Sequence, residues 1–329
     1  MGSSTAAAYA NLRTFPTRLQ SVQSSASSSP PYLPLIRPFV SSVKTSLNST
    51  VSLTSSKSRT CYYRSNWKVK SSMAEISSER KEHKKEIFET EEVLSVALAK
   101  YTADLSEKFV KERGAFTVVL SGGSLIKSLR KLVEAPYVAS IDWAKWYVFW
   151  VDERVVPKDH PDSNYKLAYD GFLSKVPIPS GQVYAINDSL PAEGAADDYE
   201  TCLKHLVNTN VLAVSTASGF PKFDLQLLGM GPDGHVASLF PGHPLVNEKE
   251  RWVTFIKDSP KPPPERITFT FPVINSSAYI ALVVVGAGKS EVVGKALGNE
   301  KSSNLLPVQM VSPEDEMIWF LDKEAASKL

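Results

Sequence analysis

A glycine-rich segment at residues 229–235, with the sequence GMGPDGH, carries the residues best suited to chemistry. It places the carboxylate of Asp233 two positions before the imidazole of His235. A histidine exchanges protons near neutral pH and a neighbouring carboxylate can orient it, so the pair suits general-base catalysis. Because Asp-Gly-His also occurs in ordinary loops, this interpretation needs support from the rest of the chain.

The same segment formally matches the G-x-G-x-x-G fingerprint of dinucleotide-binding proteins. In that motif the glycines open a helix in the first strand–helix unit of a domain. Here the next residues, 236–244, leave room for a turn or two at most, and the segment comes late in the chain. We therefore expect no NAD(P). No other cofactor and no metal are expected either.

Two further segments are typical of anion binding. Ser121-Gly122-Gly123-Ser124 follows a short apolar run and precedes a helical pattern, so its backbone N–H groups and the helix N-terminus could meet a phosphate. Lys289 follows a second apolar run, although Val283 stands where a P-loop requires glycine. A tight turn and a solvated helix end are the alternative interpretations.

A charged cluster, Asp152-Glu153-Arg154, follows another apolar run. Arg154 could bind a phosphate, a carboxylate or a developing oxyanion if the cluster lines a cleft. On an open surface the same three residues would be an ordinary solvated cluster.

The periodicity of apolar residues predicts the elements that must position these groups. Helices are expected at 86–113, 125–133, 165–173, 195–206 and 289–297, and strands at 116–120, 146–151, 223–228, 267–271, 278–285 and 317–321. The first helix should bury a stripe that includes Ile87, Val93 and Val96. Alternating strands and helices predict a three-layer α/β/α fold with a mostly parallel, Rossmann-like sheet. Ligands of such sheets bind at the carboxyl ends of the strands, where all four polar segments should meet.

Together these segments resemble the 6-phosphogluconolactonase family, plant plastid type, within the wider group that includes glucosamine-6-phosphate deaminase-isomerases. The strings LSGGS, WVDERVVP, SNY, LLGMGPDGHVASLFPG, RITFTFPVIN and GAGK appear in the order typical of that family. The resemblance spans roughly residues 86–321, and the string around His235 is its most specific part.

The resemblance implies cofactor-free hydrolysis of 6-phospho-D-glucono-1,5-lactone to 6-phospho-D-gluconate, the second step of the oxidative pentose phosphate pathway. It implies His235 as the base, Asp233 as its partner, and Arg154 or loop N–H groups as oxyanion stabilisers. The substrate and its phosphate would be bound by Gly122, Gly123, Ser124, Asp152, Asn164, Arg266 and Lys289. How Arg154, Arg266 and Lys289 share the phosphate stays open.

Two other functions fit the same fold. The deaminase-isomerases carry a glutamate five residues after the histidine, where this chain has Phe240, which favours lactone hydrolysis over isomerisation or deamination. A non-catalytic sugar-phosphate-binding protein would not need the intact Asp-Gly-His loop that this chain retains.

The composition divides the chain in two. Nine basic residues and no acidic one precede Glu75, in a stretch rich in serine. Subtracting these nine from the 37 Lys and Arg leaves 28 basic against 35 acidic residues, a net charge of −7. We therefore predict a disordered transit peptide over residues 1–72 and one catalytic domain over 73–329. An acidic body does not favour nucleic acid or an anionic membrane as partner, and no apolar run is long enough to cross a bilayer.

Three smaller features concern targeting and cysteine chemistry. The C-terminal Ser327-Lys328-Leu329 matches a peroxisomal signal, so import receptors of the plastid and of the peroxisome are the predicted protein partners. Met73 could start a shorter, cytosolic form. With Cys61 and Cys202 as the two cysteines, a disulfide framework is excluded.

Overall fold

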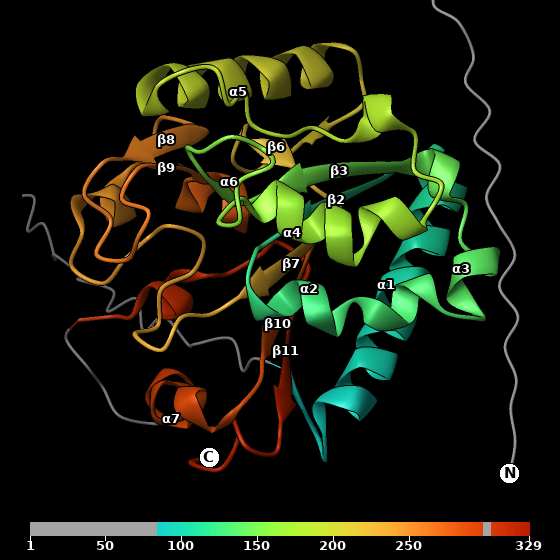
Figure 1. Ribbon diagram of the computed structural model, residues 1–329, viewed down its shortest axis with the longest axis vertical. Coiled ribbons are helices and arrows are strands. Elements are labelled where there is room, and N and C mark those ends of the chain that lie inside the picture. Colours follow the sequence, from blue (N-terminus) through green and yellow to red (C-terminus); the bar gives the residue numbers. More distant parts are fainter. Residues whose placement is uncertain (1–83, 299–303) are drawn as a thin grey trace, which may run out of the picture. The chain divides into compact units, whose positions relative to one another are not determined.

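Six strands form one parallel sheet in the order β1-β11-β10-β7-β2-β3, as Figure 1 shows for the computed structural model. The structure describes residues 84–298 and 304–329, which all fall in the compact unit Ile76–Leu329. The strands are β1 (Lys84–Phe88), β2 (Phe116–Leu120), β3 (Trp146–Trp150), β7 (Leu225–Gly229), β10 (Tyr279–Val284) and β11 (Glu316–Asp322). The predicted transit peptide 1–72, Cys61 and Met73 lie outside the described residues.

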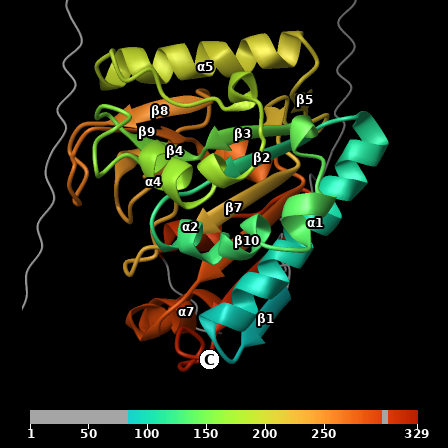
Figure 2. The same ribbon diagram turned by 45° about the vertical axis from the view of Figure 1, so that its right-hand side comes forward.

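Alternate residues of the strands pack into two separate cores, because successive side chains of a strand point to opposite faces. In β10, Ile280 and Leu282 belong to the core that also contains α5 and α7, whereas Ala281 and Val283 belong to the core that contains α1 and α2. Figure 2 shows α5 and α1 on opposite sides of the strands. The predicted three-layer α/β/α fold is therefore confirmed.

Helices of very different length cover the sheet. They are α1 (Glu91–Arg113), α2 (Ser124–Ser128), α3 (Tyr137–Ser140), α4 (Asn164–Gly171), α5 (Ala192–Asn208), α6 (Phe271–Asn275) and α7 (Ser290–Leu297). The helix predicted at 125–133 is shorter, because α2 ends at Ser128 and a 3₁₀ turn, η1 (Arg130–Val133), follows it. Within the described residues no helix is both long enough and apolar enough to span a bilayer.

The predicted start of the first helix is wrong. Residues 84–88 form the edge strand β1, paired in parallel with β11, and α1 begins only after Thr90, whose hydroxyl accepts a hydrogen bond from the N–H of Val93. Ile87 of β1 and Val93 and Val96 of α1 are about half exposed, while Leu94 and Leu98 of α1 are fully buried. The predicted stripe was therefore too wide, because periodicity alone did not show which side of the helix meets the sheet.

A second, antiparallel sheet stands beside the first. It contains β4 (Asp152–Arg154), β9 (Arg266–Phe269) and β8 (Val253–Ile256), in that order, and a two-residue pair, β5 (Ala213–Val214) with β6 (Pro221–Lys222), lies elsewhere. The strand predicted at 267–271 is therefore β9 of the antiparallel sheet and not a strand of the parallel sheet. The reason is the short connection from β8 to β9, which suits a hairpin but is too short for a parallel crossover.

Candidate active site

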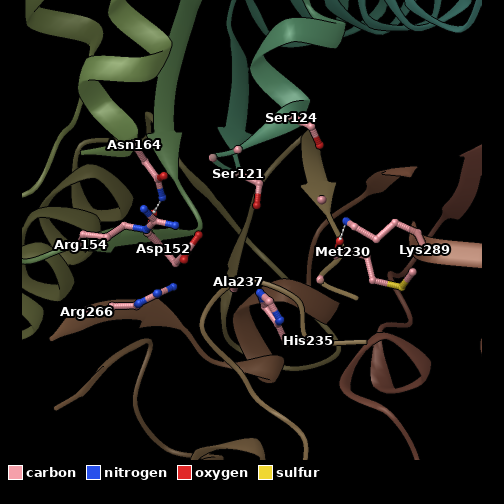
Figure 3. Close-up of a pocket in the computed structure, with 14 residues that line it drawn as sticks. Ser121, Ser124, Asp152, Arg154, Asn164, Met230, His235, Ala237, Arg266 and Lys289 are labelled. Atoms are coloured by element: carbon pink, nitrogen blue, oxygen red, sulfur yellow. Dashed lines mark hydrogen bonds between the residues drawn. The ribbon is translucent and has the colours of Figure 1, made fainter. Parts of the chain in front are cut away.

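A cavity of about 150 Å³ opens where β2, β7 and β10 end, beside β4 and β9 (Figure 3). Nine of the ten predicted site residues line it: Gly122, Gly123, Ser124, Asp152, Arg154, Asn164, His235, Arg266 and Lys289. The tenth, Asp233, lies behind the imidazole of His235. The structure therefore brings together residues that the sequence spreads over almost 170 positions.

The imidazole of His235 is held by its own loop. Its Nδ1 lies 2.5 Å from Oδ1 of Asp233, so Nδ1 carries the proton and Nε2 keeps its lone pair. A side chain at Gly231 would come within 2.0 Å of this ring, which explains the glycine there. The opposite side of the ring packs on Phe240, 4.7 Å between centroids.

The electrostatics of the pair favour a neutral imidazole beside an ionised carboxylate. Burial lowers the pKa of His235, and the charge of Lys261 adds to this, while the hydrogen bond that His235 donates to Asp233 opposes it. Burial would raise the pKa of Asp233, but hydrogen bonds from His235 and Lys261 outweigh it and bring that pKa to about 2. A neutral histidine next to an ionised aspartate can accept a proton at neutral pH.

Lys261 was not found by the sequence analysis. Its Nζ lies 3.0 Å from Oδ1 of Asp233 and 3.2 Å from Nδ1 of His235. In the sequence it stands in the proline-rich stretch KPPPE, 26 residues after the histidine, and nothing in that spacing signals a contact with the loop.

Gly122 and Gly123 form the opposite rim of the cavity. Gly123 has φ +67°, a conformation that favours glycine, and a side chain at Gly122 would lie 1.9 Å from Oδ1 of Asn164. Because α2 has only five residues, the loop N–H groups matter here more than a helix dipole. Figure 3 shows Ser121 and Ser124 at this rim, facing His235 across the cavity.

Asp152 is buried and accepts a hydrogen bond of 2.8 Å from the hydroxyl of Ser238. The side chain of Asn164 donates to its carbonyl oxygen at 3.0 Å. These contacts fix Asp152 in the wall of the cavity, and Ser238 is a second supporting residue that the sequence did not reveal.

Glu153 is also buried but does not line the cavity. Its carboxylate accepts hydrogen bonds from the N–H groups of Arg154, Asn164 and Tyr165, each at 2.7 Å. Burial raises its pKa to about 7, against the lowering effect of those N–H groups. The side chain therefore joins β4 to the start of α4 and positions two cavity residues through their backbone.

The cationic residues fall into two groups in Figure 3. Arg154 and Arg266 lie on one side, and Lys289 lies on the other, where its Nζ donates to the carbonyl of Met230. Most N–H groups of the Arg266 guanidinium are already hydrogen-bonded within the protein. They donate to the carbonyls of Lys261, Pro262 and Pro263 at 2.8–3.1 Å.

This arrangement offers a neutral base, a glycine-lined rim and cations on two sides of one cavity. Such a site can bind a small anionic molecule and remove a proton from water near it. Among the described residues no cluster of three or more His, Cys, Asp or Glu side chains could hold a metal ion.

Fold and site together define an α/β protein that acts on a small anionic ligand at the carboxyl ends of its strands. Residues 89–319 match the family described as glucosamine-6-phosphate isomerases/6-phosphogluconolactonase, and the chain belongs to that family. The chain is 72% identical over 263 residues to 6-phosphogluconolactonase 3, chloroplastic, of Arabidopsis thaliana, covering 80% of each. It is 73% identical over 245 residues to probable 6-phosphogluconolactonase 4, chloroplastic, of Oryza sativa subsp. indica, covering 74% of this chain and 76% of that one.

A solved structure agrees with the fold. The 6-phosphogluconolactonase from Thermotoga maritima superposes with a TM-score of 0.62 at 30% identity, over 73% of this chain and 100% of that one.

The contact between Gly122 and Asn164 can be tested by stability. Gly122→Ala should lower the free energy of unfolding by about 1–3 kcal/mol, because the new methyl group must displace a buried amide. Gly181→Ala is the matched control: nothing lies within 4 Å of its Cβ position, and its effect should stay within about 0.5 kcal/mol. Urea unfolding measures both, and equal effects would contradict the close approach.

Proposed function

We propose that this protein hydrolyses 6-phospho-D-glucono-1,5-lactone to 6-phospho-D-gluconate, the second step of the oxidative pentose phosphate pathway. The observation that carries the proposal is the His235–Asp233 pair, whose imidazole lines the same cavity as the glycine rim at Gly122 and Gly123. The names of relatives more than 70% identical to this chain support the same reaction.

The reaction needs only proton transfer and charge stabilisation, since the substrate is an activated ester. Nε2 of His235 takes a proton from water as the water oxygen attacks C1, which leaves a tetrahedral oxyanion. When the bond from C1 to the ring oxygen breaks, the imidazolium returns the proton to that oxygen. Acid–base assistance of this kind contributes about 10²–10⁴-fold in rate.

We assign stabilisation of the oxyanion to Arg154. It lines the cavity, and among the described residues its buried Nε has no hydrogen-bond partner, while Nη1 donates to the carbonyl of Asp162 at 2.9 Å. Free donors of a guanidinium strengthen their hydrogen bonds as negative charge develops, and removal of one such donor costs about 3–4 kcal/mol. Loop N–H groups at the glycine rim are the alternative donors.

The phosphate is assigned to the loop at Gly122, Gly123 and Ser124 together with Lys289. Lys289 has two free N–H groups after its bond to Met230, and a lysine held in that position is a point charge for phosphate. Arg266 keeps fewer free donors, so it contributes mainly charge from the facing side. Binding energy from the distant phosphate holds C1 against the attacking water, which raises the rate.

Phe240 separates this proposal from isomerase or deaminase chemistry. Its ring is 2% exposed and packs directly on the ring of His235, at the position where deaminase-isomerases carry a glutamate. A phenyl ring cannot relay a proton, so the glutamate relay of the deaminase-isomerases is missing at this position. Ammonia release from glucosamine 6-phosphate would contradict this assignment.

His235→Ala tests the base. Turnover of the lactone, generated in place from glucose 6-phosphate, should fall about 10²–10⁴-fold, because the general base is lost. The affinity for 6-phosphogluconate, measured by calorimetry, should change little, since the anion-binding groups remain. Equal loss of turnover and product affinity would instead assign His235 to binding, and wild-type decay no faster than background would remove the lactonase proposal.

Lys289→Met tests the phosphate assignment. KM for the phosphorylated lactone should rise at least about tenfold, because a charged hydrogen bond to phosphate is lost. KM for unphosphorylated D-glucono-1,5-lactone should not change, which makes that compound the internal control. If Arg266→Gln shows this pattern and Lys289→Met does not, the assignment is reversed.

The destination of the protein is proposed to be the plastid, with residues 1–72 as the transit peptide. Their basic, acid-free composition and the chloroplastic names of the relatives support this. Residues 1–72 fused to a fluorescent protein should enter isolated chloroplasts and be shortened there, whereas a fusion starting at residue 73 should stay outside. Retention of the first fusion outside would contradict the proposal; peroxisomal and cytosolic forms stay predictions.

A further inference from the structure

One oxygen of the Asp233 carboxylate accepts hydrogen bonds from two donors. Nδ1 of His235 and Nζ of Lys261 both lie within 3.0 Å of the same oxygen, Oδ1, and 3.2 Å from each other. The ammonium of Lys261 disfavours a positive charge on His235, because an imidazolium would lie directly beside it.

Lys261 is held in this place by its own backbone. Its carbonyl accepts a hydrogen bond from Nη2 of the buried Arg266 at 2.8 Å and a second from the hydroxyl of Ser259 at 2.9 Å. Its N–H donates to the same hydroxyl at 3.3 Å. These hydrogen bonds fix the backbone of Lys261 in the loop between β8 and β9, although its side chain is about one third exposed.

We propose that Lys261 is a positioning residue for the lactonase reaction, whose ammonium shares the Asp233 carboxylate with His235 and so keeps the imidazole neutral. The proposal rests on the function proposed above. Lys261 does not line the cavity, so it acts through the pair rather than on the substrate. During catalysis it makes the transient imidazolium a stronger acid, which favours return of the proton to the ring oxygen.

The two carboxylates that act on His235 have the opposite effect from Lys261. Asp152 on β4 favours the protonated ring, and Asp233 on the same loop does so more strongly, whereas the charge of Lys261 opposes protonation. Arg154, Arg266 and Lys289 also line the cavity, and the contact of Arg266 with Lys261 uses the backbone carbonyl, which a side-chain substitution keeps.

Lys261→Met removes the charge and keeps most of the stem. The acid limb of the kcat/KM–pH profile should move to higher pH, since His235 then stays protonated over a wider range. Activity at pH 6 should therefore fall about threefold further than activity at pH 8, given that a charge within 4–6 Å shifts a titration by about 1 unit or more. Lys261→Arg should restore the wild-type profile.

Lys257→Met is the matched control. This lysine belongs to the same connection, but its Nζ lies over the ring of Phe255 and near Glu193, away from His235. It should leave the pH profile unchanged. If Lys261→Met raises KM and leaves the profile in place, Lys261 binds substrate and the proposal is wrong.

A second readout does not depend on activity. The imidazole of His235 can be titrated by NMR in wild type and in Lys261→Met, and its signal identified by its loss in His235→Ala. A higher midpoint in Lys261→Met supports the proposal even if the reaction assigned to the protein is wrong. Coinciding midpoints would overturn it.

Discussion

The hydrogen bond between Asp233 and His235 is the contact on which the proposed chemistry depends. It fixes the tautomer of the ring, so that the nitrogen with the lone pair is Nε2 and not Nδ1, which faces Asp233. It is strong because it is partly buried and because the carboxylate is ionised. Gly231 leaves room for both side chains, because a Cβ there would lie 2.0 Å from the imidazole and 2.6 Å from Oδ1 of Asp233.

The antiparallel sheet supports this pair from the other side. It carries Asp152 and Arg154 on one strand and Arg266 on a neighbouring strand, in register with Arg154. Two arginines side by side would repel each other, and the carbonyl groups that they contact and the carboxylates of Asp152 and Asp162 compensate for this. The parallel sheet thus supplies the base and the anion rim, and the small sheet supplies the facing cations.

Much of this could be predicted from sequence. The buried strands are continuous apolar runs, so their positions and their parallel arrangement followed from composition, and polar segments after such strands had to meet at one edge. The start of α1 was missed, because the edge strand β1 becomes a strand only by pairing with β11, more than 200 residues away. The same holds for β9, whose partner strands are set by tertiary pairing and not by its own residues.

The sequence by itself determined the chemistry: which residues can exchange protons, where the backbone is free of side chains, and in which order the strands and helices follow. These are properties of residue types and short spacings, so they are visible without coordinates. Only the tertiary structure decided which charges act together. Lys261 contacts Asp233 and His235, whereas Arg154 and Lys289 lie on different sides of the cavity. The reason is that folding brings distant loops to the same sheet edge, and electrostatic interactions depend on distance in space and not along the chain.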